Sequence, residues 1–324
     1  MDNLLVCGQN FFGTATIYDV DFYNALAKHF NMYYYGQNYL DNPGNTSLRD
    51  VIEKNNIDIV LYQYYKQGLD EFLELRFDKK YLLLSDLQKH PFGVRRAEDI
   101  SKIIEKSDLK AVLFRGLYGE YLKIDSDKMH FFPWSIDENT YSFSLKKDND
   151  VCFLGCYGSK YPIRKYIKPE VRRFCGARNY SLLSGRRSGE AKTDINFMNK
   201  YSDKQIDRQM VGAGYVKALQ RSKLMLFDSS IYKYPVKKYF ECMATGCLIL
   251  ADKPHHAEEI GLIENRHFVP INKDNWKSKV EYYLKKKDER EKIVHRARKL
   301  FLKRHTNKVR IGQLLNIFYD ADSL

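Results

Sequence analysis

The 324-residue sequence lacks the features that mark several large classes of protein. No apolar run approaches the ~20 residues that cross a bilayer, and the N-terminal residues contain neither a basic leader nor a long apolar stretch. The six cysteines are scattered, without a CxxC pair or a Cys/His group at zinc spacing, so we expect buried thiols. P-loop, HExxH and serine-triad motifs are also absent. These absences predict a cytoplasmic chain without a recognisable metal centre.

Composition indicates a folded protein with an uneven distribution of charge. Apolar residues make up 44% and aromatic residues 14% of the chain, which excludes disorder as its main state. Its length suits two domains of ordinary size. Residues 1–143 hold 16 basic and 21 acidic side chains, a net charge of −5, whereas the remaining residues have a net charge of +18. The second half is therefore the half expected to bind an anion.

The first half alternates apolar strand patterns with helical patterns, which is typical of a parallel sheet covered on both faces. We expect a Rossmann-like domain over residues 1–143. Its predicted strands lie at residues 3–8, 32–36, 57–63, 81–86, 110–114 and 130–134, and its predicted helices at residues 19–29, 48–54, 69–75, 97–106 and 118–123.

A second alternation follows a polar linker at residues 133–149 and predicts a second Rossmann-like domain over residues 144–304. Residues 305–324 are expected to form a C-terminal helix that packs back toward the first domain. The predicted strands lie at residues 151–155, 180–183, 224–229, 247–252 and 267–271, and the predicted helices at 162–174, 215–222, 236–245 and 274–305. Residues 185–214 have no assignment. In doubly wound sheets ligands bind beyond the carboxyl ends of the strands, so we expect the site in the cleft between the two domains.

The most informative stretch is YPVKKYFECMATGCLILAD, residues 234–252. Its pattern predicts a helix that ends at Gly246 and leads into a buried strand. Lys238 and Glu241 are three residues apart, so they share one face near the helix start, where backbone N–H groups attract phosphate. The alternative is an ion pair on a solvated helix surface.

This segment resembles the donor-site signature of GT-B glycosyltransferases, in their group-1 and spore-protein-like branch. Pro235, Lys238, Glu241, Ala244 and Gly246 fit that signature. The resemblance continues through FLGCYGSKYPIR, YVKALQRSKLMLFDSS, YYLKKKDEREKI and HTNKVR. It implies an α/β GT-B fold, with two Rossmann-like doubly wound domains facing across a cleft. It also implies an enzyme that transfers a sugar from a nucleotide-sugar, without a bound metal or a cofactor beyond that co-substrate.

The resemblance also implies roles for residues of the second half. Glu241 would bind the ribose of the donor, and the catalytic Lys238 would lie near its phosphates or sugar. Many group-1 members have a second glutamate at the position of Lys233, and this difference leaves the stereochemistry of transfer open.

The loop after the strand at residues 151–155 supplies further donor-binding candidates. Gly155 and Gly158 follow a strand and precede a helix, so their backbone could approach a diphosphate closely. Lys160 or Arg164 could neutralise that diphosphate, although Arg164 could equally lie on the helix surface. Tyr157 belongs to the same group of donor-binding candidates.

Candidates on the acceptor side come from the first half. Asp86 and His90 follow a predicted strand, where a general base or a sugar-contacting group could lie. Gly13 and Thr14, also in the first half, resemble the glycine-containing loop that reaches the cleft in the family, and they belong to the donor-binding candidates.

The leading interpretation is transfer from a UDP- or GDP-sugar to a hydroxyl of a glycan, a lipid-linked acceptor or a protein. A glycosyltransferase that modifies DNA bases is an alternative, although the acceptor half is net acidic. A nucleotide-sugar 2-epimerase and a non-catalytic nucleic-acid-binding protein are further alternatives. The basic stretch at residues 274–305 could also contact an anionic membrane, which would place the protein at the inner membrane surface.

Overall fold

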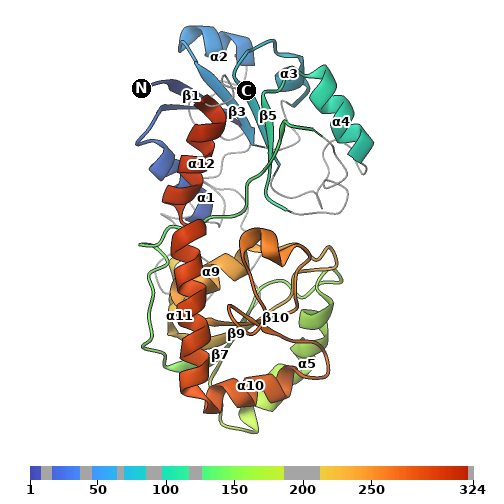
Figure 1. The fold of residues 1–324 in the computed structure, drawn as a ribbon, viewed down its shortest axis with the longest axis vertical. Helices are drawn as coiled ribbons and strands as arrows, with labels where there is room; N and C mark the ends of the chain where they lie inside the picture. Colours follow the sequence, from blue (N-terminus) through green and yellow to red (C-terminus); the bar gives the residue numbers. More distant parts are fainter. Residues whose placement is uncertain are drawn as a thin grey trace. The chain divides into compact units, whose positions relative to one another are not determined.

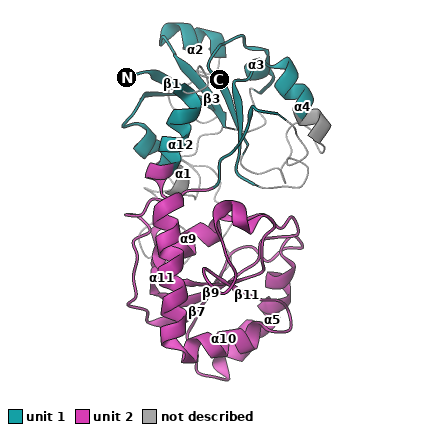
Figure 2. Ribbon diagram, viewed as in Figure 1, with its two compact units in different colours: residues 1–12, 22–133, 310–324 teal, residues 13–21, 134–309 magenta. Residues whose placement is uncertain are grey.

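The computed structural model describes residues 1–8, 17–36, 46–63, 69–84, 97–116, 126–185 and 212–319. The chain divides into two compact units (Figures 1 and 2). The first unit comprises Met1–Phe12, Phe22–Pro133 and Arg310–Leu324. The second unit comprises Gly13–Asp21 and Trp134–Val309.

The first unit is built on a parallel sheet with the strand order β2-β1-β3-β4-β5-β6. Its strands are β1 (Asn3–Gly8), β2 (Asn31–Tyr35), β3 (Ile59–Gln63), β4 (Lys80–Leu84), β5 (Ala111–Phe114) and β6 (Met129–Phe131). The helices α1 (Ile17–Leu26), α2 (Leu48–Lys54), α3 (Leu69–Glu74) and α4 (Ala97–Lys106) alternate with them along the chain. Strands β3, β4 and β5 are buried along their whole length, as expected for a sheet covered on both faces.

The core of the first unit includes residues from the end of the chain. Helix α12 (Asn307–Tyr319) buries Ile311, Leu314 and Phe318 among the apolar side chains of β1, β3 and α1. The hydroxyl of Tyr81 donates a hydrogen bond to the backbone oxygen of Phe318 at 3.3 Å. The last helix therefore completes the core of the first unit.

The second unit contains a parallel sheet with the strand order β11-β10-β9-β7-β8. Its strands are β7 (Asn149–Leu154), β8 (Leu182–Gly185), β9 (Ser222–Leu226), β10 (Leu248–Ala251) and β11 (Val269–Pro270). Its helices are α5 (Pro162–Gly176), α8 (Gly212–Arg221), α9 (Lys237–Thr245), the short 3-10 helix η3 (Ala257–Ile260), α10 (Trp276–Lys285) and α11 (Lys287–Arg304). Leu224, Leu250 and Trp276 lie in the core between sheet and helices.

The strand order of the second sheet determines where a ligand site is expected. From β7 the chain moves to one side to form β8, and then crosses to the other side of β7 to form β9 and β10. The pair β7 and β9 is therefore the point at which the winding of the sheet reverses. Ligands of doubly wound sheets bind beyond the carboxyl ends of the strands at this point.

The described elements agree closely with the predicted ones, with one clear correction. The prediction of a single helix over residues 274–305 is wrong, because the helix is interrupted at Lys286 (φ −94°, ψ 74°), which separates α10 from α11. Arg290 of α11 donates hydrogen bonds to the last carbonyls of α10, at 2.6 Å from the oxygen of Tyr283 and 3.3 Å from that of Leu284. The predicted helix at residues 118–123 lies outside the described residues.

Candidate functional site

The site is organised around helix α9, which follows β9. The helix begins after Val236, which provides no side-chain cap for the first backbone N–H groups. It ends at Gly246, whose φ of 75° lies in the left-handed region. A Cβ at Gly246 would lie 2.8 Å from the ring of Phe143, so this position favours glycine on two counts. The helix therefore has a fixed end and a start whose N–H groups can attract an anion.

Lys238 and Glu241 are buried on the inner face of α9, with 8% and 1% of their surfaces exposed. The hydroxyl of Tyr215, from α8, donates a hydrogen bond to Glu241 Oε2 at 2.5 Å. Lys238 Nζ donates to the same hydroxyl at 3.1 Å. Glu241 Oε1 is also buried, and no described residue donates a hydrogen bond to it. This carboxylate oxygen is therefore available to a donor group from a ligand.

Gly155 brings the loop after β7 into contact with the same cluster. Its φ is 132°, and a Cβ at this position would lie 2.9 Å from Arg164 Nη1 and 3.2 Å from Lys238 Cε. The lysine and the arginine therefore converge on the backbone at the carboxyl end of β7. Two cations beside the backbone of a glycine at the end of a strand suit a phosphate group.

Arg164 is held in place by a carboxylate. Its Nε donates to Asp228 Oδ1 at 2.6 Å, and both side chains are almost fully buried. Asp228, which follows β9, also accepts a hydrogen bond at 2.8 Å from the backbone N–H of Ile163 in the first turn of α5. The ring of Tyr161 lies 3.7 Å from the guanidinium carbon. Asp228 therefore caps α5 and fixes the direction of Arg164 at once.

A second aspartate organises the loop at the end of β10. Asp252 accepts hydrogen bonds from the backbone N–H of Ser229 at 2.7 Å, from its hydroxyl at 2.8 Å and from Lys233 Nζ at 2.5 Å. Ser230 and Lys233 have φ values of 72° and 54°. These contacts tie the loops that follow β9 and β10 to each other beside the switch point.

Comparison with known proteins relates part of the chain to a described family. Residues 183–316 match a family model described as glycosyl transferase-like. No curated protein sequence matches the chain. Much of the second unit is therefore similar to glycosyl transferase-like proteins.

Solved structures of glycosyltransferases show the same GT-B fold along the whole chain. A glycosyltransferase from Rickettsia africae is 14% identical with a TM-score of 0.63, covering 99% of this chain and 98% of its own. Anabaena HepE in complex with UDP and glucose is 11% identical with a TM-score of 0.65, and both chains are fully covered. An α-glucosyltransferase in complex with UDP and a 13-mer DNA containing an HMU base is 9% identical with a TM-score of 0.65, covering 98% and 99%. The predicted fold class of two doubly wound α/β domains is thus confirmed.

The structure brings four of the predicted site residues together: Gly155, Arg164, Lys238 and Glu241. The surface alternatives for the lysine, the glutamate and the arginine are wrong, because all three are buried. Their roles in donor binding remain predictions.

Three other predicted residues have contacts of a different kind. Tyr157 stacks on Phe153 and donates a hydrogen bond to its backbone oxygen at 2.8 Å, which ties it to the core of the second unit. Lys160 Nζ lies 6.0 Å from the ring centre of Tyr232. A Cβ at Gly158 would meet nothing within 4 Å, so no close approach requires glycine there. The catalytic candidates Asp86 and His90 and the donor-binding candidates Gly13 and Thr14 lie outside the described residues.

Sequence reasoning did not find Tyr215 or Asp228. Tyr215 lies on the apolar face of α8, where a buried hydroxyl needs a partner, but the pattern does not reveal which one. Asp228 lies close after the buried strand β9. A carboxylate at the end of a strand was the one signal in the sequence that could have predicted the capping of a neighbouring helix.

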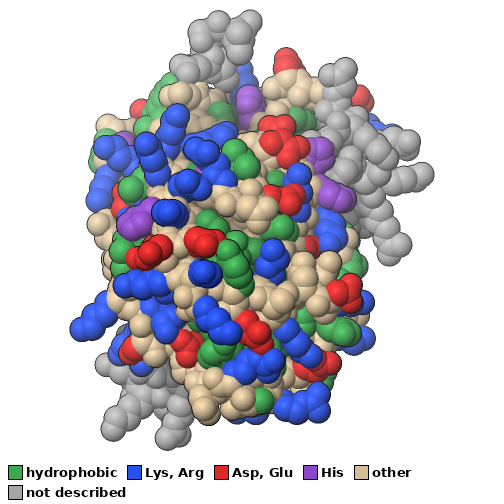
Figure 3. Space-filling model, turned by 60° about the horizontal axis from the view of Figure 1, so that its bottom comes forward, with side chains coloured by type: hydrophobic (Ala, Val, Ile, Leu, Met, Phe, Trp, Pro, Cys, Tyr) green, Lys and Arg blue, Asp and Glu red, His purple; other side chains and the backbone are tan. Residues whose placement is uncertain are grey.

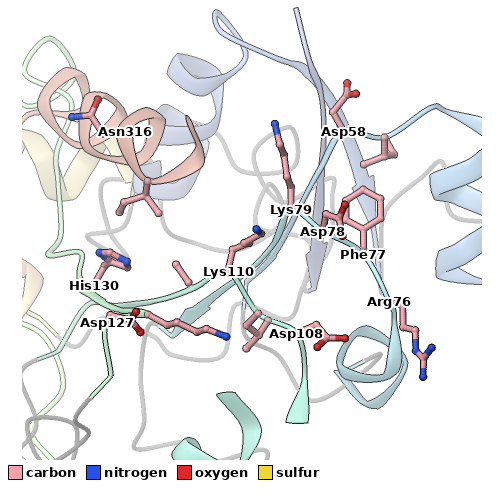
Figure 4. Close-up of a pocket in the computed structure, with 15 residues that line it drawn as sticks. Asp58, Arg76, Phe77, Asp78, Lys79, Asp108, Lys110, Asp127, His130 and Asn316 are labelled. Carbon is pink, nitrogen blue, oxygen red and sulfur yellow. The ribbon is translucent and has the colours of Figure 1, made fainter. Parts of the chain in front are cut away.

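The first unit contains a hollow of about 1310 Å³ (Figure 4). Its labelled side chains come from the turns before β3, β4, β5 and β6, from His130 of β6 and from α12. These turns lie at the amino ends of the strands, opposite to the edge where doubly wound sheets bind their ligands. The lining mixes acidic side chains such as Asp78 and Asp127 with basic ones such as Lys79 and Lys110. We therefore do not assign the acceptor site to this hollow.

Proposed function

We propose that the protein transfers a sugar from a nucleotide-sugar to an acceptor hydroxyl, using the Lys238–Glu241 cluster to hold the donor. The observation that carries this proposal is the buried Glu241 carboxylate, which has one oxygen bound to Tyr215 and the other unpartnered among the described residues. A ribose hydroxyl can donate to that oxygen. A UDP- or GDP-sugar is the donor that we expect.

In the proposed reaction, the bond between the anomeric carbon and the phosphate oxygen breaks, and the nucleoside diphosphate departs with the electron pair. The acceptor oxygen bonds to the anomeric carbon, and its proton passes to water or to the departing diphosphate. Lys238, Arg164 and the N–H groups at the start of α9 stabilise the negative charge that develops on the leaving group. Because these donors are already oriented, we propose that the reaction proceeds without a bound metal ion.

We propose a glycan, a lipid-linked molecule or a protein as the acceptor. The negative net charge of residues 1–143 disfavours a polyanionic acceptor such as DNA. A second candidate is nevertheless transfer to a modified DNA base, because a structural neighbour is in complex with DNA containing an HMU base. Transfer of radiolabelled sugar to an HMU-containing duplex would favour this second candidate.

A peripheral contact with an anionic membrane also belongs to the proposal. Lys292, Arg296, Lys299 and Lys303 recur at helical spacing on α11, all are exposed, and α11 has no acidic residue after Glu291. Lysine and arginine also gather on the face that is turned forward in Figure 3. Such surfaces attract anionic headgroups. No helix in the described part of the chain is long and apolar enough to span a membrane.

The first experiment is a thermal-shift screen of UDP-, GDP-, dTDP- and CDP-sugars. A ligand that binds only the folded state at 100 times its dissociation constant stabilises the protein by ~2.7 kcal/mol. The cognate donor is expected to raise the unfolding temperature by several degrees, and a nucleotide assay then measures release of the diphosphate with candidate acceptors. If no nucleotide-sugar or nucleoside diphosphate raises the unfolding temperature, the proposed function is refuted. Sugar turnover without any acceptor would instead favour the epimerase alternative.

A further inference from the structure

The hydroxyl of Tyr215 lies between two opposite charges. It donates to Glu241 Oε2 at 2.5 Å and accepts from Lys238 Nζ at 3.1 Å. We propose that Tyr215 is a positioning residue of the donor site, whose hydroxyl separates the ammonium from the carboxylate so that both can act on the donor. The inference rests on the proposed nucleotide-sugar donor and adds a residue to its site.

The positions of the two charges on α9 explain why a spacer is needed. Lys238 and Glu241 are one turn apart on the same face of the helix, within reach of each other. Both are buried, and attraction between opposite charges is much stronger in a buried site than in water. Without an intervening group, the favoured arrangement is a direct ion pair. Such a pair would direct the lysine and the glutamate toward each other and away from a ligand.

The hydroxyl satisfies this attraction without bringing the charges into contact. It donates a hydrogen bond to Oε2 of Glu241, and Oε1 has no partner among the described residues. The ring of Tyr215 lies 5.0 Å from Lys238 Nζ, measured to its centre, and further restrains the lysine beside Gly155. Tyr215 thereby presents one carboxylate oxygen to a ribose hydroxyl and keeps the ammonium near the place proposed for the diphosphate.

Tyr215 is 3% exposed and belongs to α8, whereas both charged residues belong to α9. The spacer therefore comes from a different element, and its position depends on how these two helices pack. A phenylalanine would preserve the ring and this packing while removing only the hydroxyl. The substitution Tyr215→Phe isolates the proposed role for this reason.

The first arm of the test is a crystal structure of the ligand-free Tyr215→Phe protein. We expect Lys238 Nζ to move to within about 4 Å of a Glu241 carboxylate oxygen, the range of an ion pair. An unchanged separation of the two groups would overturn the proposal. This arm needs no ligand, so it decides the spacer role even if the proposed function fails.

The second arm measures the binding of UDP and GDP by calorimetry. We expect Tyr215→Phe to lower the affinity for the nucleotide that binds the wild-type protein by at least tenfold. The unfolding temperature of the variant should change little. Tyr283→Phe, which removes the hydroxyl of a buried tyrosine of α10, is the matched control and should bind as the wild type does. Wild-type affinity in the Tyr215→Phe protein would overturn the proposal, whereas no binding by the wild type would refute the proposed function.

A double variant separates positioning from general damage to the fold. Glu241→Gln removes the negative charge that attracts Lys238. In this variant the Tyr215 hydroxyl no longer has two opposite charges to keep apart. Adding Tyr215→Phe to Glu241→Gln should therefore weaken UDP or GDP binding by less than twofold relative to Glu241→Gln alone. Fully additive losses in affinity would show that the tyrosine acts independently of the charge pair, which contradicts the proposed spacer role.

Discussion

Glu241→Gln tests the proposed donor site most directly, because the effects on binding and on stability are expected to differ. The side chain is 1% exposed, and one carboxylate oxygen has no partner among the described residues. A hydrogen bond from a ligand hydroxyl to a charged acceptor contributes about 1.5–3 kcal/mol. Its loss corresponds to a decrease in affinity of roughly 10- to 150-fold. The glutamine retains the shape of the side chain but not its charge.

The stability of the ligand-free protein should respond differently. A buried charge with an unsatisfied oxygen is costly, so replacing it by a neutral amide removes part of that cost. The amide oxygen can still accept from Tyr215. We therefore expect the free energy of unfolding to change by less than about 1 kcal/mol in either direction.

Calorimetry with UDP and GDP measures the affinity, and urea unfolding measures the stability. Glu170→Gln, which removes a carboxylate that pairs with Lys277 on the same unit, is the control and should leave nucleotide affinity unchanged. If Glu241→Gln binds the nucleotide as tightly as the wild type, the assignment of this carboxylate to the donor is refuted. A large loss of stability together with normal binding would show that the glutamate has a structural role instead.

Three further outcomes are expected. Lys238→Met should slow sugar transfer at saturating donor by roughly 100-fold, about 3 kcal/mol, because an oriented charge near the leaving group is lost; an unchanged kcat would contradict that role. Gly155→Ala should lower the free energy of unfolding, measured in urea, by about 1–3 kcal/mol, because the alanine Cβ would meet Arg164 and the φ of Gly155 is 132°. The control Gly158→Ala should have little effect. Burial lowers the pKa of His267, and Nδ1 accepts from the backbone N–H of Ile263 at 3.1 Å. The unfolded chain therefore takes up a proton at His267 before the folded chain does as the pH falls through about 6.5, so the free energy of unfolding should decrease below that pH. His267→Gln should reduce this decrease. If urea unfolding gives the wild type and the variant the same dependence of stability on pH, the prediction is contradicted.

The fold could be predicted largely because apolar periodicity is a local property. Strands such as β3 and β10 are continuous apolar runs, and parallel sheets bury such runs on both faces. The break at Lys286 could not be predicted in the same way. Residues 274–305 keep a helical pattern across it, and the break is held by contacts between Arg290 and the last carbonyls of α10.

The candidate site was predictable only in part, for a similar reason. Lys238 and Glu241 are close in sequence, so helical spacing alone places them on one face. Tyr215 precedes Glu241 by 26 positions, and Asp228 follows Arg164 by 64. These partners meet because α8, α9 and α5 pack around the same strands, and side-chain pairing over such separations leaves no periodic signal in a single sequence.

The charges of the site indicate how donor binding should depend on salt. Arg164 pairs with Asp228, Lys233 pairs with Asp252, and Lys238 is linked to Glu241 through Tyr215. The described site is therefore close to neutral, and a diphosphate would be held by oriented donors rather than by an excess of positive charge.

Buried contacts of this kind are screened much less than surface charges, whose interactions fall off over ~10 Å at 0.1 M salt and ~3 Å at 1 M. The affinity for UDP or GDP should thus change by less than about threefold between roughly 0.1 and 0.5 M NaCl. Binding to vesicles of anionic lipid through α11 should fall sharply over the same range, because its lysines and arginines are exposed. A steep decrease in nucleotide affinity with salt would instead show that the diphosphate binds at the exposed basic surface, which contradicts the buried donor site.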